Sequence, residues 1–193
     1  SGRRAQSNRC RIRSTRRGHV QTVTMFVLAA ALTLHLIPRP QSVQTAPCSI
    51  ALTHASTTHQ LDPASIEEIR RRWGALGVPV DLARVTVARA SLPSQAYRLK
   101  VSPAGVSIDS GDSDGVFYAT MTLAQLAQRV NGKWVLPCVD ISDAPALRWR
   151  VLSDDVSRGP LPNMRYFEER IRTIAAFKTV SYTHLTLPTI LRV

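Results

Sequence analysis

This 193-residue sequence has few aromatic residues, no long apolar run and no zinc-site spacing of cysteines, and each absence excludes a class of protein. Aromatic residues make up only 6% of it, and no stripe of Lys and Arg interleaved with aromatics runs through its body. Such stripes are typical of proteins that bind nucleic acid, so we expect no nucleic-acid partner. No apolar run reaches the roughly 20 residues of a transmembrane helix, which predicts no stable membrane span. The cysteine spacing matches no zinc site, and we expect no metal.

The formal net charge of +12 comes mainly from one end of the chain. Seven arginines and no acid lie in the first 17 residues, which leaves +5 for the remaining 176. An apolar run at residues 23–36 follows, with small residues at 29–31. A basic stretch, a short apolar run and a small-residue cleavage site are typical of a secretory signal. We therefore predict export to the periplasm or the extracellular space; the alternative is a buried helix or strand at the domain edge.

Three cysteines occur, and one of them, Cys10, would leave with the signal. Cys48 and Cys138 would remain as an even pair in an oxidising compartment. About ninety residues separate them, and that distance in sequence says little about distance in space. Buried free thiols are the favoured interpretation, and a disulfide is the alternative.

The stretch at residues 36–143 predicts an α+β body with a small sheet and two helices. Asp62 before Pro63 predicts the start of the first helix, with a capping box from Ser65 to Glu68, and Gly77 ends it. The second helix is expected from residue 116 to residue 130 because apolar residues recur at helical spacing. Period-two alternation and short apolar runs predict strands at 85–88, 97–101, 106–108, 134–136 and 139–141.

A strand, a loop and an amphipathic helix are predicted at residues 147–178. The strand covers 149–155, and Asn163 caps a helix whose apolar face carries Phe167 and Ile171. This is the repeating unit of an α/β fold, present once. Its apolar face has too few partners within this chain, so we expect the unit to dock loosely on the body or to aggregate.

Polar residues gather where that strand ends and its loop begins, at residues 152–160. In α/β barrels this end of a strand is where substrates are held. Arg158 offers up to five hydrogen-bond donors in one plane, which suits the neighbouring hydroxyls of a sugar ring. The alternative is an ion pair between Asp155 and Arg158 that only orders the turn, and spacing alone favours the ion pair.

A series of short motifs follows in a fixed order along the chain. They include Arg148-Trp149-Arg150, Asp155-Val156-Ser157-Arg158 and the segments 36–41, 97–101, 105–108, 114–119, 122–126, 137–145 and 167–178. Their order and spacing resemble the glycoside hydrolase family 20 β-N-acetylhexosaminidases. The resemblance covers the non-catalytic N-terminal domain and the first strand and helix of the catalytic barrel.

The resemblance implies four regions. A basic tail with a signal peptide occupies residues 1–35, and the hexosaminidase N-terminal α+β domain occupies 36–145. The start of an incomplete (β/α)8 barrel, also called a TIM barrel, occupies 146–179. The tail at 180–193 does not resemble a second barrel strand. It is similar to translated sequencing-adapter read-through and is therefore predicted to be non-native.

The resemblance also implies the chemistry. The family removes terminal β-linked N-acetylhexosamine from glycans with retention, and the substrate's own acetamido oxygen is the nucleophile. No cofactor or metal is needed. Arg158 occupies the position of an arginine that binds sugar hydroxyls, and Asp155 supports its loop. The family's catalytic Asp–Glu pair lies on a later barrel strand, so we assign no catalytic residue here and expect the chain alone to be inactive.

A departure from the family besides the tail, and several alternatives, accompany this interpretation. Val151 stands where the family usually has glycine after Arg-Trp-Arg. One alternative is the front domain of another glycosidase, such as an α-N-acetylglucosaminidase, an O-GlcNAcase-like or hyaluronidase-like enzyme, or an α-glucuronidase. Another is a non-catalytic carbohydrate-binding module, although one arginine without stacking aromatics makes a weak sugar site.

Overall fold

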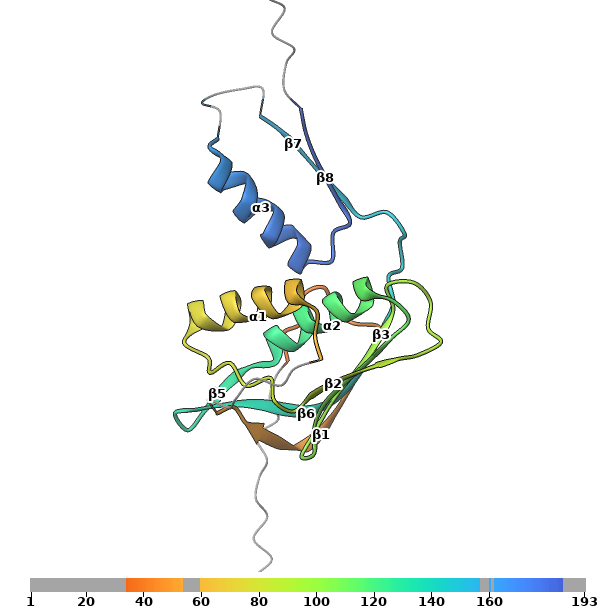
Figure 1. The fold of residues 1–193 in the computed structure, drawn as a ribbon, viewed down its shortest axis with the longest axis vertical. Coiled ribbons are helices and arrows are strands. Elements are labelled where there is room, and N and C mark those ends of the chain that lie inside the picture. Colours follow the sequence, from red (N-terminus) through yellow and green to blue (C-terminus); the bar gives the residue numbers. More distant parts are fainter. Residues whose placement is uncertain (1–33, 54–59, 157–159, 161, 186–193) are drawn as a thin grey trace, which may run out of the picture. The chain divides into compact units, whose positions relative to one another are not determined.

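The computed structural model describes residues 34–53, 60–156, 160 and 162–185. Within them the chain forms a six-stranded sheet, a separate pair of strands and three helices (Figure 1). The six-stranded sheet has the order β1-β6-β3-β4-β2, with β5 paired to β6. The elements are β1 Ser42–Ala51, α1 Pro63–Leu76, β2 Val85–Arg89, β3 Tyr97–Ser102, β4 Gly105–Ser110, α2 Ser113–Leu126, β5 Gln128–Val130, β6 Lys133–Asp143, β7 Val151–Asp155, α3 Met164–Ala176 and β8 Ser181–Leu185.

Two helices and a sheet form the body, which confirms the predicted α+β class. Helices α1 and α2 lie side by side over one face of the sheet (Figure 1). The alternation in β3 explains this packing: Tyr97, Leu99 and Val101 are buried beneath the helices, while the intervening Arg98 and Lys100 are exposed. Because successive side chains of a strand point to opposite faces, only one face of β3 joins the core.

The predicted ends of α1 are confirmed. The Asp62 carboxylate accepts from the Ser65 amide at 3.0 Å, and Gly77 closes the helix with a left-handed φ of 70°. The capping box was wrong, because Glu68 does not turn back to the helix start. Its carboxylate is instead buried between arginines, with the Arg71 Nη2 at 2.7 Å.

Helix α2 is shorter than predicted and starts earlier. It begins at Ser113, where Asp112 accepts from the Gly115 amide at 2.8 Å, and it ends at Leu126. Residues 128–130 pair with 133–135 as an antiparallel hairpin instead of extending the helix. Its two turn residues, Asn131 and Gly132, both have positive φ, which matches the twist of a tight hairpin.

The far edge of the sheet also departs from prediction. β1 was not predicted, because its sequence shows no clear alternation and most of its side chains are exposed. It pairs antiparallel with β6, which is one strand of 11 residues instead of the two short strands expected. This edge holds the two cysteines that remain after the predicted signal.

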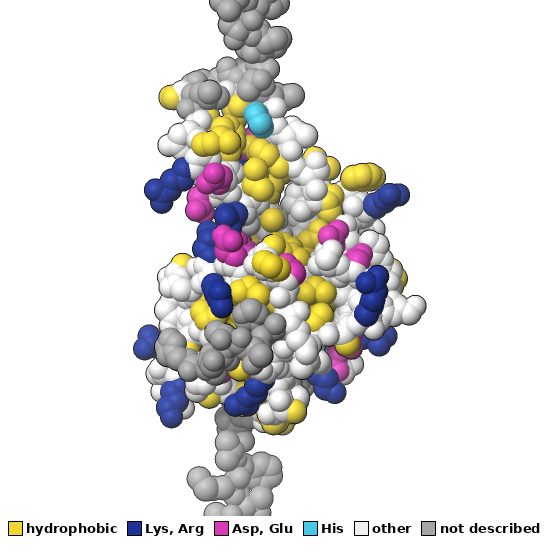
Figure 2. All heavy atoms as spheres, viewed as in Figure 1, with side chains coloured by type: hydrophobic (Ala, Val, Ile, Leu, Met, Phe, Trp, Pro, Cys, Tyr) yellow, Lys and Arg dark blue, Asp and Glu magenta, His cyan; other side chains and the backbone are white. Residues whose placement is uncertain are grey.

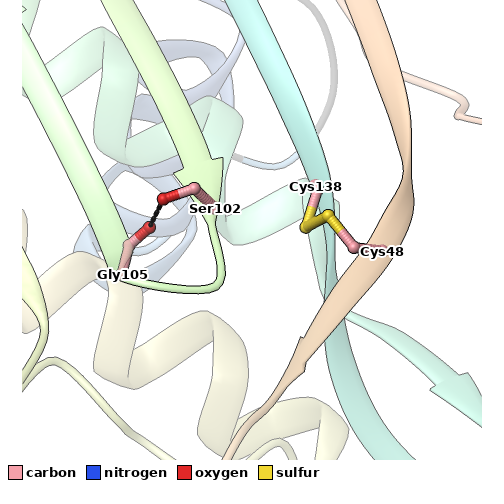
Figure 3. The surroundings of a disulfide bond; sticks show 4 residues. All are labelled: Cys48, Ser102, Gly105 and Cys138. Atoms are coloured by element: carbon pink, nitrogen blue, oxygen red, sulfur yellow. Dashed lines mark hydrogen bonds between the residues drawn. A yellow bond between two sulfur atoms is a disulfide. The ribbon is translucent and has the colours of Figure 1, made fainter.

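Cys48 and Cys138 form a disulfide, which corrects the favoured interpretation of free thiols. Cys48 lies on β1 and Cys138 on the adjacent β6, close to the hairpin turn marked by Ser102 and Gly105 (Figure 3). The pairing of the two strands brings the Cα atoms to 5.2 Å, within the usual range for a disulfide. Strand pairing thus supplies the proximity that the sequence separation of 90 hides.

The remaining elements form a strand–helix–strand unit. β7 and β8 pair in parallel, and α3 connects them. The predicted strand and the Asn163 cap are confirmed, since the Asn163 side chain accepts from the Tyr166 amide at 3.0 Å. β8 lies inside the stretch predicted to be a non-native tail; that prediction concerns the origin of these residues and stays a prediction.

Among the described residues, no helix is both long enough and apolar enough to cross a membrane. The predicted basic tail and signal lie almost wholly in residues 1–33, outside the described residues. The strand–helix–strand unit has an unusual surface. Together with residues 146–150, which lead into it, the unit holds seven of the ten exposed large hydrophobic side chains of the described chain: Leu147, Trp149, Val151, Met164, Tyr166, Ile171 and Phe177. Yellow side chains gather over this part in Figure 2.

Candidate functional site

The carboxyl ends of β7 and β8 meet at one edge, because the strands are parallel. There Asp154 pairs in register with His184, and Asp155 pairs with Leu185. Asp155 is therefore placed where the sequence predicted it, at the end of the strand and the start of its loop. Arg158, the predicted sugar-binding residue, lies outside the described residues.

The two faces of β7 differ in what they contact. Leu152 and Asp154 are half-buried, whereas Val151, Ser153 and Asp155 alternate with them and are exposed. The half-buried face is the one that α3 covers, since Asp154 contacts Arg170 of that helix. Asp155 therefore lies on the face of β7 that α3 does not cover.

Asp154 has a different role, which the sequence did not suggest. Its carboxylate accepts from the Arg170 Nε and Nη2, each at 3.0 Å, and from the Tyr182 hydroxyl at 3.2 Å. The hydrogen bonds from Arg170 hold the pKa of Asp154 below its usual value. Burial, together with the nearby carboxylate, raises the pKa of Tyr182. Asp154 thus joins β7, α3 and β8, and at neutral pH it is an ionised anchor and not a general acid.

The adjacent acids Glu67 and Glu68 of α1 differ in their environments, because Glu67 lies on the surface and Glu68 is buried. Glu68 is only 5% exposed. Burial acts to raise its pKa, but hydrogen bonds and charges from the arginines outweigh burial and lower it. Its carboxylate oxygens lie 2.9 Å from the Arg72 Nη2 and 3.2 Å from the Nη1 of Arg172 on α3. These contacts tie α1 to α3, so the pair is structural.

Arg150, just before β7, joins four segments. Its Nε donates to the Lys178 carbonyl at 2.5 Å, and its Nη1 donates to the Leu147 carbonyl at 2.7 Å. Its Nη2 donates to the Gln95 side-chain oxygen at 2.8 Å and to the Tyr118 hydroxyl at 3.3 Å. All three nitrogens of the guanidinium therefore have acceptors, and Nη2 is the one that joins the unit to the body.

Lys178, between α3 and β8, reaches into the end of the sheet. Its ammonium donates to the Asp143 carboxylate at 2.6 Å and to the Tyr97 hydroxyl at 2.9 Å. Only 7% of the residue is exposed. Burial lowers the pKa of Lys178, while the hydrogen bond and charge of Asp143 act to raise it. Burial also raises the pKa of Tyr97, so its hydroxyl stays protonated.

A cavity of about 260 Å³ lies beside these contacts. Arg150, Lys178 and Asp143 line it, but they hydrogen-bond to the protein around them. The rest of the wall is mixed: five residues are proline, alanine or leucine, and five carry polar groups, namely Arg39, Gln41, Gln95, Tyr97 and Tyr118. Substrates of α/β barrels are held at the carboxyl ends of the strands, whereas this cavity lies at the other end of β7, beside Arg150. The edge at Asp155 is therefore the better candidate for a sugar site.

The chain is similar in sequence to known glycoside hydrolases. Residues 33–144 match the family described as glycosyl hydrolase family 20, domain 2. A β-hexosaminidase of Akkermansia muciniphila is 38% identical over 73 residues, 37% of this chain and 15% of that protein. A β-hexosaminidase of Vibrio vulnificus is 32% identical over 136 residues, 67% of this chain and 16% of that protein.

A solved structure shares the fold. The family 20 exo-β-N-acetylglucosaminidase of Vibrio harveyi, in complex with N-acetylglucosamine, aligns with a TM-score of 0.68 at 21% identity. The alignment covers 78% of this chain and 26% of that one. The chain therefore spans about a quarter of this structure, and 15–16% of the two curated relatives.

Proposed function

Because the chain belongs to glycosyl hydrolase family 20, we propose that it forms the front part of a β-N-acetylhexosaminidase that removes terminal β-linked N-acetylhexosamine from glycans. One observation carries the proposal: the match to domain 2 ends at residue 144, and a parallel strand–helix–strand unit follows directly. A parallel unit of this kind is the repeat from which a (β/α)8 barrel is built. β7, α3 and β8 are then its beginning.

The substrate-facing part of the chain is the carboxyl edge of β7. Substrates of barrel enzymes are held at the carboxyl ends of the strands, and Asp155 occupies that end on the open face. Arg158 follows three residues later in the sequence. We assign Arg158 to the hydroxyls of the terminal sugar and Asp155 to the support of its loop.

The hydrolytic step is assigned to later barrel strands. Family members use the substrate's acetamido group as nucleophile, so the protein supplies one acid and one residue that orients the acetamido group. Asp154 and Glu68 each lie next to a second acid in the sequence, but both are held in ion pairs by arginines. Neither is therefore a candidate for the catalytic acid. We therefore expect no turnover of a chromogenic N-acetylglucosaminide by the 193-residue chain alone.

The test begins with the source gene. The reading frame is extended from the source DNA past the codon of Lys178, and the continuous protein is assayed with 4-nitrophenyl N-acetyl-β-glucosaminide. The expected result is release of nitrophenol from this substrate and not from the matching β-glucoside. An extended frame that encodes no barrel, or a folded product that hydrolyses neither substrate, contradicts the proposal.

A matched pair of substitutions tests Arg158. Arg158→Lys keeps the charge but loses the planar pair of donors, so kcat/KM is expected to fall about tenfold to hundredfold. Arg165→Lys, on the exposed side of α3, is the control and should leave kcat/KM within about twofold. Equal activities of the two variants would remove Arg158 from the sugar site.

Export is part of the same proposal. A disulfide between Cys48 and Cys138 suits the oxidising compartments outside the cytoplasm. The basic stretch and apolar run of residues 1–36 suit a secretory signal. Expression of the chain in its source host should yield an exported form that lacks the basic stretch, detected by N-terminal sequencing. A chain recovered only from the cytoplasm with its first 30 residues intact would contradict export.

A further inference from the structure

We propose that Arg150 and Lys178 are positioning residues: they fix the orientation of β7 and β8 relative to the body, and so the position of the carboxyl edge of these strands. This inference rests on the proposed function, because that function is what gives the edge its sugar contact. The two residues lie at the same end of the unit: Arg150 lies just before β7, Lys178 lies between α3 and β8, and the Arg150 Nε donates to the Lys178 carbonyl.

The Arg150 main chain also forms hydrogen bonds that hold the unit together. Its carbonyl accepts from the Val180 amide at 2.9 Å and from the Ser181 amide at 3.4 Å, where β8 starts. Its side chain meanwhile reaches Gln95 and Tyr118 of the body. One residue therefore fixes the starts of both strands and ties them to the body.

Lys178 supplies a second anchor at the end of the sheet. Its backbone φ of 63° turns the chain sharply from α3 toward β8. Asp143 and Tyr97, which receive the ammonium, are register partners on β6 and β3. The anchor thus contacts two central strands, which are among the most rigid parts of a domain.

Few apolar contacts fix the unit in place. A two-stranded sheet is only marginally stable by itself. Ala176 is the one buried residue of α3 among those described, and Ile171 is 46% exposed. Directional polar contacts are therefore what determine the orientation of β7 and β8 relative to the body.

A small change at Arg150 is magnified at the edge. Asp155 lies five residues along the strand, about 16 Å away at the usual rise per residue. A tilt of roughly 5° at Arg150 would move Asp155 by about 1.4 Å. Displacements near 1 Å are enough to change sugar contacts and catalytic rates markedly.

The first test uses amide hydrogen exchange in the 193-residue chain. Arg150→Lys keeps the charge but cannot donate in three directions from one plane. Exchange at residues 151–155 and 181–185 should accelerate about tenfold, while residues 97–101 of the central strand keep their protection. The matched control is Arg148→Lys, because Arg148 is exposed and stacks on Trp149 at 5.4 Å from the ring centroid. This control should change exchange less than about twofold.

The second test changes only the body. Gln95→Asn tolerates the left-handed backbone at this position, whose φ is 66°, but shortens the arm that meets Arg150. If Gln95→Asn also loosens residues 151–155, the body transmits its placement through this contact. The same variant decides the question if Arg150→Lys does not fold.

Three outcomes would overturn the proposal: wild-type exchange of β7 in Arg150→Lys, wild-type exchange of β7 in Gln95→Asn, or an equal loss of protection in β3 and β7. The last would mean that Arg150 contributes general stability and not placement. Failure of the proposed function is a separate result, because exchange is measured without any sugar or turnover.

Discussion

Removing the disulfide should destabilise the body by several kcal/mol. Cys48 and Cys138 are 90 residues apart, and the loop they close contains both helices of the body and four strands of its sheet. In the chain-entropy model a loop of this length contributes about 4.5 kcal/mol, because the cross-link restricts the unfolded chain. Cys138 is only 2% exposed, so alanine is the suitable replacement and leaves no buried hydroxyl.

The assay is urea unfolding followed by tryptophan fluorescence, in which Trp73, fully buried in the core, reports the loss of packing. With a urea m-value of roughly 2 kcal/mol/M, Cys48→Ala/Cys138→Ala should lower the midpoint by about 2 M. The background carries Cys10→Ala, so that no third thiol can exchange. The parent chain in excess reductant should unfold with the double variant. A shift below about 0.5 M, or no effect of reductant on the parent, would refute the loop argument.

Five further substitutions, two of them controls, test other features. Gly105→Ala should cost about 2 kcal/mol in urea unfolding, because φ is 141° and a Cβ would lie 2.7 Å from a backbone carbonyl oxygen; Gly74→Ala, with nothing within 4 Å, should instead add about 0.5 kcal/mol. Glu68→Gln should cost about 3 kcal/mol, because it removes the buried negative charge, and one of the two acceptor oxygens, that three arginines contact. Glu67→Gln, at an exposed site, should cost under about 0.5 kcal/mol. Burial acts to raise the pKa of Asp112, but hydrogen bonds from two backbone amides and a serine lower it overall, so its stabilisation is present above the unfolded pKa of about 3.9 and lost as pH falls through the folded value. Asp112→Asn keeps only one of the two acceptor oxygens, so it should lower the stability at pH 7 by about 1 kcal/mol and flatten the acid limb of stability against pH; an unchanged acid limb would refute this assignment.

Local signals allowed the helices to be predicted. Asp62 and Asn163 are side chains that accept from backbone amides three residues later, and Gly77 adopts the left-handed conformation that ends a helix. Each of these depends on residues within one turn, so the sequence alone contains the information. Strand β3 was equally readable because its alternation of buried and exposed residues is complete.

Signals that depend on distant partners were missed. Asn131-Gly132 suits both a helix end and a hairpin turn, and the pairing of β5 with β6 decided for the hairpin. β1 can be recognised as a strand only from its pairing with β6, and that pairing also brings Cys48 and Cys138 together for the disulfide. No periodicity within residues 42–51 indicates either one.

The candidate site was predictable in part for the same reason. The place of Asp155 at a strand end follows from local pattern, and the structure confirms that place. The ion pair of Asp154 with Arg170 spans 16 residues, and the contact of Lys178 with Tyr97 spans 81. Such contacts are set by how the elements dock and not by any sequence motif.

The polar character of the junction between body and unit has a physical consequence. A buried ion pair such as Lys178 with Asp143 contributes little net stability, because the cost of removing both charges from water offsets their attraction. It does, however, disfavour every misplaced arrangement strongly, since each one leaves a buried charge without its partner. Apolar contacts tolerate sliding, whereas the donors of Arg150 and Lys178 each require one acceptor in one direction. The junction therefore selects one orientation of β7, and with it the position of Asp155 at the carboxyl edge.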